Sequence, residues 1–174
     1  VMTVGNGDFA FSADVTGMQT FEDHYYQNGI PLETRTTWAW HSFPNTENYT
    51  LEDAMQPIDF HGRKIMYASI QKSPAGDYFR KNPHPIPMGQ ISLAGENTRP
   101  LTREMIRDIE QQLNLWTGLV SSNYTIDGQE VRVETVSHPD KSLVAFKIKS
   151  DLLASGKLKP RFHFPYSYDF SKKN

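Results

Sequence analysis

The fold class follows from residues 109–149, which read IEQQLNLWTGLVSSNYTIDGQEVRVETVSHPDKSLVAFKIK. Apolar and polar residues alternate in four runs of this stretch, and alternation with a period of two is typical of a β-strand with one buried face. Turn residues separate the runs, namely Thr117-Gly118, Asp127-Gly128 and Ser137–Asp140. Asp-Gly between two such runs is a strong hairpin signal. The stretch therefore predicts a meander of antiparallel strands.

Similar patterns occur on both sides of the meander. Residues 9–15 alternate strictly, and residues 37–42 place Trp38 and Trp40 on one face of a short predicted strand. Residues 57–67 predict a hairpin that turns at His61-Gly62. A last strand is expected at residues 158–164, where Pro160 is best tolerated at a sheet edge.

Helical patterns are scarce. We expect one short turn after Thr102, which is a suitable N-cap, and another at Asp151–Ser155 that ends at Gly156. Four prolines, at positions 74, 83, 85 and 87, are expected to exclude regular structure from residues 68–88. The predicted fold is all-β, a large antiparallel β-sandwich (supersandwich-like) with long aromatic-rich loops and little helix, and residues 1–174 form a single domain.

Composition narrows the classes of function. The 174 residues carry a net charge of -2, with a pI near 6.3, so nothing favours nucleic acid or an anionic membrane surface as a partner. No apolar run approaches the roughly 18 residues that a membrane-spanning helix requires. The chain has no cysteine, which excludes disulfides, a thiolate nucleophile and thiolate metal ligands.

Aromatic residues concentrate outside the predicted strands. Eleven of the 21 aromatic residues lie between Phe21 and Phe79, mostly in the long loops 16–36, 43–57 and 68–88. Loops of this length in a compact domain are usually functional or lie against another surface. We therefore expect these side chains to form a second small core or to meet a partner.

The best candidates for ligand contact lie in this region. Trp38, Trp40 and His41 follow one another in TTWAWHS, and His84 lies in the loop KNPHPIPMG. A tryptophan beside a polar group suits a sugar, whose C–H face stacks on the indole while its hydroxyls form hydrogen bonds. The alternative is that both tryptophans are core residues of a sandwich strand, which their spacing also permits.

Other chemistry has less support. The histidines form no HxH, HxxH or HExxH arrangement, so the sequence gives no reason to expect zinc. Asp8 and Asp14 fall on one strand face but about 20 Å apart, whereas catalytic carboxylate pairs lie roughly 5 to 9.5 Å apart. We interpret both as exposed acids of a strand or turn. The basic residues of positions 157–173 alternate with apolar ones, which indicates a solvated strand face.

Two segments resemble a known family. TVGNGDFAFSADVTGMQTF, residues 3–21, is similar to the start of the N-terminal β-sandwich of bacterial glycoside hydrolases and phosphorylases related to glycoside hydrolase family 65. Residues 113–150 resemble the later strands of the same domain, where a leucine-acid-x-x-threonine-glycine turn precedes a strand pair. Asn114 stands where that pattern usually has aspartate. Together the segments lie near both ends of the chain.

The resemblance implies a role without catalysis for this segment. The family continues into an (α/α)6 barrel that carries the catalytic residues, so no catalytic residue is assigned here, and no metal or cofactor is expected. The implied partners are the C-terminal catalytic barrel of the same polypeptide and a carbohydrate substrate, which Trp38, Trp40, His41 and His84 would contact or brace. The resemblance also implies a periplasmic or extracellular location. Alternatives are a free-standing carbohydrate-binding module and a purely structural sandwich.

Overall fold

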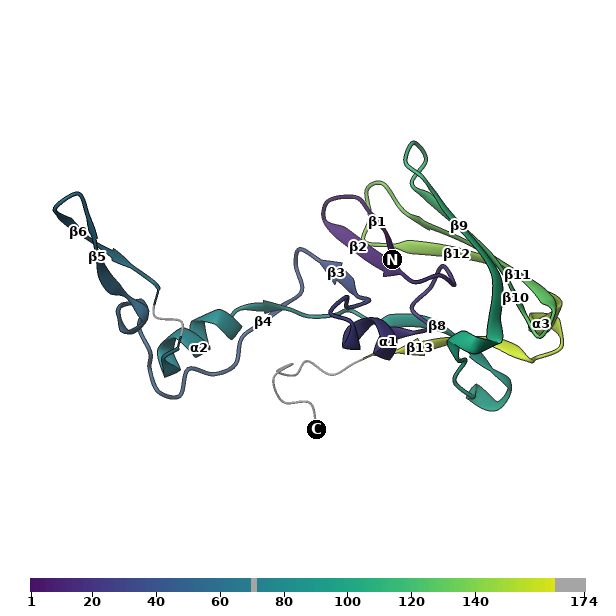
Figure 1. The fold of residues 1–174 in the computed structure, drawn as a ribbon, viewed down its shortest axis with the longest axis horizontal. Helices are drawn as coiled ribbons and strands as arrows, with labels where there is room; N and C mark the ends of the chain where they lie inside the picture. The colour runs from purple at the N-terminus through teal and green to yellow at the C-terminus, as the bar shows by residue number, and fades with distance from the viewer. Residues whose placement is uncertain (70–71, 165–174) are drawn as a thin grey trace. The chain divides into compact units, whose positions relative to one another are not determined.

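The computed structural model describes residues 1–69 and 72–164. The fold is all-β, with several antiparallel sheets and short helices. Contacts between Cα atoms divide the described residues into two compact units, and Figure 1 shows the elements of both. Unit 1 contains residues 1–39 and 87–164, and unit 2 contains residues 40–69 and 72–86.

The predicted meander is confirmed as a four-stranded antiparallel sheet in unit 1. Its order is β12-β11-β10-β9, and its strands are β9 (Ile106–Asn114), β10 (Leu119–Ile126), β11 (Gln129–Ser137) and β12 (Val144–Lys149). Asp127 and Gly128 both have positive φ, at 50° and 75°, which is the backbone geometry of a type I′ hairpin turn.

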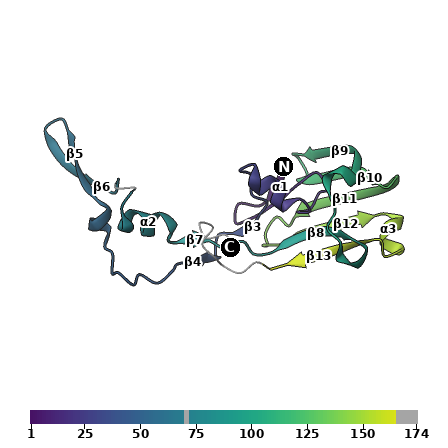
Figure 2. The same ribbon diagram turned by 60° about the horizontal axis from the view of Figure 1, so that its bottom comes forward.

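Two smaller sheets complete unit 1. One has the order β1-β2-β3, with β1 (Met2–Gly5), β2 (Phe9–Ala13) and β3 (Thr34–Thr36). The other pairs β8 (Gln90–Gly95) with β13 (Leu158–His163), so Pro160 lies on an edge strand as predicted. Figure 2 shows these strands from a second direction.

Both small sheets bury their apolar side chains against the same face of the four-stranded sheet. Phe9, Phe11 and Ala13 of β2 pack with Val120 of β10, and the Phe11 ring meets the edge of Phe146 at 5.2 Å. A second cluster joins β8 and β13 to the rest of that face; its buried members include Leu93, Leu158, Ile106, Tyr124, Ile126, Val131 and Val133. Unit 1 is therefore a two-layered, sandwich-like structure.

The helices of unit 1 are short, with three to six residues each. They are α1 (Glu22–Gln27), η2 (Glu96–Thr98), η3 (Arg103–Met105) and α3 (Asp151–Ala154). The predicted turns after Thr102 and at 151–155 are confirmed as η3 and α3. No helix among the described residues is long and apolar enough to cross a membrane.

Unit 2 contains a hairpin, short helices and a two-residue ladder. Its elements are β4 (Trp40–His41), η1 (Leu51–Ala54), β5 (Gln56–Phe60), β6 (Arg63–Tyr67), α2 (Pro74–Lys81) and β7 (His84–Pro85). The β5–β6 hairpin confirms the prediction for residues 57–67. The predicted strand at 37–42 is reduced to Trp40–His41, because Trp38 lies in a bend.

The expectation that residues 68–88 lack regular structure is wrong for α2. Pro74 occupies the first turn of this helix, where a backbone N–H has no intrahelical partner and its absence is tolerated. Ser73 is the N-cap, and its Oγ accepts a hydrogen bond from Gly76 N at 3.0 Å. The remaining prolines follow the helix, and Pro83 comes directly after its C-cap, Asn82.

Candidate functional site

Three of the four predicted contact residues come together in unit 2. Strand β4 pairs antiparallel with β7, which places Trp40 opposite Pro85 and His41 opposite His84. Residues 41 and 84 are therefore direct cross-strand neighbours despite their distance in the sequence. Trp40 is 54% exposed at this ladder. Its exposure shows that it is not a core residue of a strand.

An aromatic cluster surrounds the two histidines. The ring centroids of His41 and His84 lie 5.1 Å apart, and Phe43 stacks on His84 at 5.3 Å with an interplanar angle of 30°. His41 meets the edge of the same Phe43 ring at 4.8 Å. We call these three side chains the His–Phe cluster.

Among the described residues, only some of the polar atoms in the His–Phe cluster form hydrogen bonds. The Nδ1–H of His84 donates to Lys81 O at 2.8 Å, which leaves its Nε2 as the second ring nitrogen. Asn82 Oδ1 accepts from Phe43 N at 2.7 Å. Within the described part of the chain, His41 Nδ1 and His84 Nε2 are buried and lack a hydrogen-bond partner. Such atoms are costly to enclose, so they mark a place where a polar contact is missing.

Trp38 belongs to unit 1 and is not part of that cluster. It is 64% exposed and lines an apolar groove of about 320 Å³. The other groove residues come from β2, β3, β8, β12, β13 and adjacent loops, and they are Phe9, Thr34, Thr36, Met88, Gly89, Gln90, Ile91, Ser142, Val144, Phe162 and Phe164. The alternative that Trp38 is a core residue is therefore wrong as well.

A few polar groups line the Trp38 groove. Thr36 is 8% exposed, and its Oγ1 has no hydrogen-bond partner among the described residues. Gln90 is buried nearby, and its Oε1 accepts a hydrogen bond from His163 Nδ1 at 2.9 Å. The groove thus combines an exposed indole with an uncompensated hydroxyl and an amide, a mixture that suits a ligand with both C–H and O–H groups.

Asp14 is a feature that sequence reasoning missed. The interpretation of Asp14 as an exposed acid is wrong, because it is 0% exposed, and its carboxylate accepts hydrogen bonds from Thr16 N at 2.8 Å and Phe21 N at 2.7 Å. Burial raises the pKa of Asp14 despite these bonds. The carboxylate closes the loop between residues 14 and 21 and is enclosed by it, which indicates a structural role. Burial and the charge of Asp14 also raise the pKa of Tyr124.

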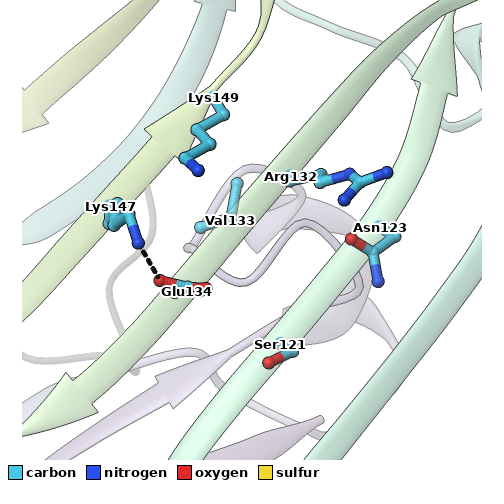
Figure 3. A pocket seen from close by; sticks show the side chains of 7 residues that line it. All are labelled: Ser121, Asn123, Arg132, Val133, Glu134, Lys147 and Lys149. Carbon is cyan, nitrogen blue, oxygen red and sulfur yellow. Dashed lines mark ion pairs between the residues drawn. The ribbon is translucent and has the colours of Figure 1, made fainter.

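A second concave surface lies on the opposite face of the four-stranded sheet from the core. It has a volume of about 260 Å³ and is lined by the polar residues Ser121, Asn123, Arg132, Glu134, Lys147 and Lys149, and also by Val133, whose side chain belongs to the core. Figure 3 shows these side chains, which come from β10, β11 and β12. They were missed because polar residues that alternate with apolar ones are expected on any solvated strand face.

The described residues contain no group of three or more His, Asp or Glu side chains that could hold a metal ion. No family model, curated protein or solved structure matches the chain. The chemistry of the exposed side chains is therefore the main support for any function.

Proposed function

We propose that this chain is the non-catalytic β-sandwich portion of a carbohydrate-processing enzyme, related to glycoside hydrolase family 65, in which Trp38 and Trp40 contact sugar. The main support is that both tryptophans of the TTWAWHS segment are more than half exposed. Burying a large aromatic side chain contributes about 1.5–3 kcal/mol to stability. Most of that contribution is unused at these two positions, so folding alone does not account for them.

The Trp38 groove has the composition of a sugar contact. Its apolar walls would accept the C–H face of a pyranose stacked on the indole. Thr36 and Gln90 line the groove with neutral polar side chains, which match sugar hydroxyls without a change in protonation. Few polar groups line the groove, so it offers a sugar few hydrogen bonds. This contact would therefore form one part of a larger binding site, to which it adds affinity and orientation.

The His–Phe cluster would act as a brace for Trp40. His41 follows Trp40 directly, and its pairing with His84 holds the short β4–β7 ladder in register. Phe43 packs on both imidazoles and shields them from water. We therefore assign His41 and His84 as positioning residues that keep the indole of Trp40 at the surface.

The β5–β6 hairpin supports the part of the proposal that concerns a protein partner. Ile58, Phe60, Met66 and Tyr67 on this hairpin are 40–59% exposed. A two-stranded hairpin is only marginally stable in water unless something covers one face. The catalytic barrel of the same polypeptide is the partner that the family resemblance implies, and a periplasmic or extracellular location belongs to the same proposal.

A tryptophan series tests the sugar contacts. We would titrate a panel of neutral oligosaccharides into the native polypeptide that contains this chain and record affinity by calorimetry, for the wild type and for Trp38→Ala, Trp40→Ala and Trp116→Ala. Trp116 is the matched control, because it is 96% exposed at the β9–β10 turn and lines neither the Trp38 groove nor the His–Phe cluster. We expect Trp38→Ala and Trp40→Ala each to bind at least about threefold more weakly than the wild type. Trp116→Ala should bind with the affinity of the wild type. Equal affinities in all four folded proteins would refute the proposal.

A free-standing carbohydrate-binding module is the second candidate function. The Trp38 groove favours it, since this groove lies entirely within unit 1 and has the volume of a small ligand site. The same titration with the 174-residue chain separates the two. Sugar affinity in this chain equal to that of the native polypeptide would favour the binding module.

A further inference from the structure

The polar face of the four-stranded sheet carries an unbalanced set of charges. Along one row, the register places Lys149 opposite Arg132, and Arg132 opposite Asn123. In the next row, Lys147 lies opposite Glu134, and their side chains form an ion pair at 3.0 Å. Figure 3 shows both rows and the Lys147–Glu134 pair. The two rows thus differ in how their charges are compensated.

The pairing of Lys149 with Arg132 lowers the stability of the sheet when no ligand is bound. Like charges directly opposite each other on antiparallel strands are destabilising, whereas opposite charges stabilise. One guanidinium nitrogen of Arg132 contacts Glu130 at 3.3 Å, in a pair that is largely exposed. Among the described residues no acidic side chain pairs with Lys149. Lys149 therefore has no ion-pair partner among the described residues, although Glu130 and Asp151 line a neighbouring hollow with it.

The surroundings of these cations form a small concave site. The lining contains three cations and one acid, Glu134, although the whole chain has a net charge of -2. Ser121 and Asn123 contribute neutral hydrogen-bond donors from β10, the strand beside Arg132. A volume of about 260 Å³ is below the range of sites for drug-sized ligands. It fits one charged group or one sugar ring.

We propose that this sheet face binds an oxyanion, held by Lys149 and Arg132 and oriented by Asn123. The group is a carboxylate or sulfate carried by an acidic saccharide, or free inorganic phosphate. Planar guanidinium and ammonium groups bind such oxygens through charge-assisted hydrogen bonds, which are stronger than neutral ones. An anion between the two cations would also relieve their repulsion. The inference does not depend on the sugar contacts of Trp38 and Trp40, which lie elsewhere in the molecule.

The test is a titration of the chain with inorganic phosphate, inorganic sulfate, glucuronate and glucose, followed by amide chemical shifts at constant ionic strength. We expect saturable shifts in β10, β11 and β12 with the anions and none with glucose. Arg132→Gln and Lys149→Gln should each weaken binding by about tenfold. Lys157→Gln, which removes an exposed charge of unit 1 outside this site, should leave it unchanged. Circular dichroism would establish that each variant is folded.

The order of the affinities identifies the source of the anion, and three other results would overturn the proposal. Tighter binding of glucuronate than of phosphate assigns the site to an acidic saccharide, and the reverse order assigns it to free phosphate. The proposal is overturned if no anion gives saturable shifts in this sheet, if glucose binds as well as glucuronate, or if Lys157→Gln weakens binding as much as Lys149→Gln. Loss of neutral oligosaccharide binding in the tryptophan variants would not bear on it.

Discussion

We expect the replacement of Asp14 by alanine to destabilise unit 1 far more than the replacement of an exposed acid does. The carboxylate of Asp14 is fully buried and accepts hydrogen bonds from Thr16 N, Thr16 Oγ1 and Phe21 N. These bonds close the loop that follows β2, and this loop contributes Met18 and Phe21 to the core. The substitution therefore removes an acceptor on which the position of two core side chains depends.

The size of the loss in stability follows from the hydrogen bonds that the substitution removes. A hydrogen bond contributes about 0.5–1.5 kcal/mol, and a buried donor left without a partner costs about 1–3 kcal/mol. Removing the buried carboxylate also removes its own desolvation penalty, which offsets part of the loss. We therefore expect Asp14→Ala to lower the free energy of unfolding by about 3 kcal/mol. For a chain of this size that corresponds to a decrease in Tm of about 6–12 °C.

The assay is equilibrium unfolding in urea at pH 7, with Asp8→Ala as the matched control. Asp8 is an exposed acid six residues earlier, immediately before the strand β2 that Asp14 follows, and its replacement should change the free energy of unfolding by less than about 0.5 kcal/mol. If Asp14→Ala were no more destabilising than Asp8→Ala, the assignment of Asp14 as the acceptor that closes this loop would be refuted.

The pH dependence of the same site has a definite sign. Burial raises the pKa of Asp14 above its ordinary value of 3.8, so the folded state binds this proton more tightly than the unfolded state does. The stabilisation from the bound proton is complete below pH 3.8 and is lost as the pH rises through the raised pKa. The wild type should therefore lose stability relative to Asp14→Asn as the pH rises through this window. A difference that stays constant or grows in favour of the wild type would contradict this.

Three further predictions concern other positions. Thr36→Val should leave the free energy of unfolding unchanged or raise it by up to about 1 kcal/mol, because the buried hydroxyl has no partner among the described residues; a loss above about 1 kcal/mol would contradict this. Gly5→Ala would place a Cβ 2.4 Å from Phe9 O and should cost about 1–3 kcal/mol in urea unfolding, more than Gly95→Ala, whose Cβ would lie 3.4 Å from Arg99 O in ordinary van der Waals contact. Phe60 on the β5–β6 hairpin is 59% exposed, so Phe60→Ser should reduce self-association of the 174-residue chain in sedimentation velocity; an unchanged sedimentation coefficient at high concentration would contradict this.

Local patterns in the sequence predicted most of the sheet structure. The meander and the hairpin at 57–67 were correctly predicted, because period-two alternation and the turn residues Asp127-Gly128 and His61-Gly62 are local signals. The helix at Pro74–Lys81 was missed, since a proline in its first turn looks the same in sequence as a proline that prevents a helix. Unit boundaries have no comparable local signal, and neither does the packing of β8 and β13 on the meander.

The candidate site was predicted in part for similar reasons. Trp40 and His41 were chosen because they are adjacent, and His84 because of its loop, but their pairing spans more than 40 residues and could not be derived from spacing. Trp38 proved to belong to a different unit, because the chain bends at Thr37-Trp38 and the strand begins only at Trp40. The burial of Asp14 was missed because nothing in the strand pattern reveals that the following loop folds over its carboxylate.

Turnover of glycosides by the native polypeptide tests the central proposal most directly. We would assay a panel of aryl glycosides, with and without phosphate, and compare kcat/KM for the wild type, Trp40→Ala and the control Trp116→Ala. We expect activity in the native polypeptide, none in residues 1–174 alone, and a loss of about tenfold in Trp40→Ala, equivalent to about 1.4 kcal/mol of transition-state stabilisation, with the control unchanged. A native polypeptide without activity towards any glycoside, or folded Trp40→Ala with the kcat/KM of Trp116→Ala, would contradict it.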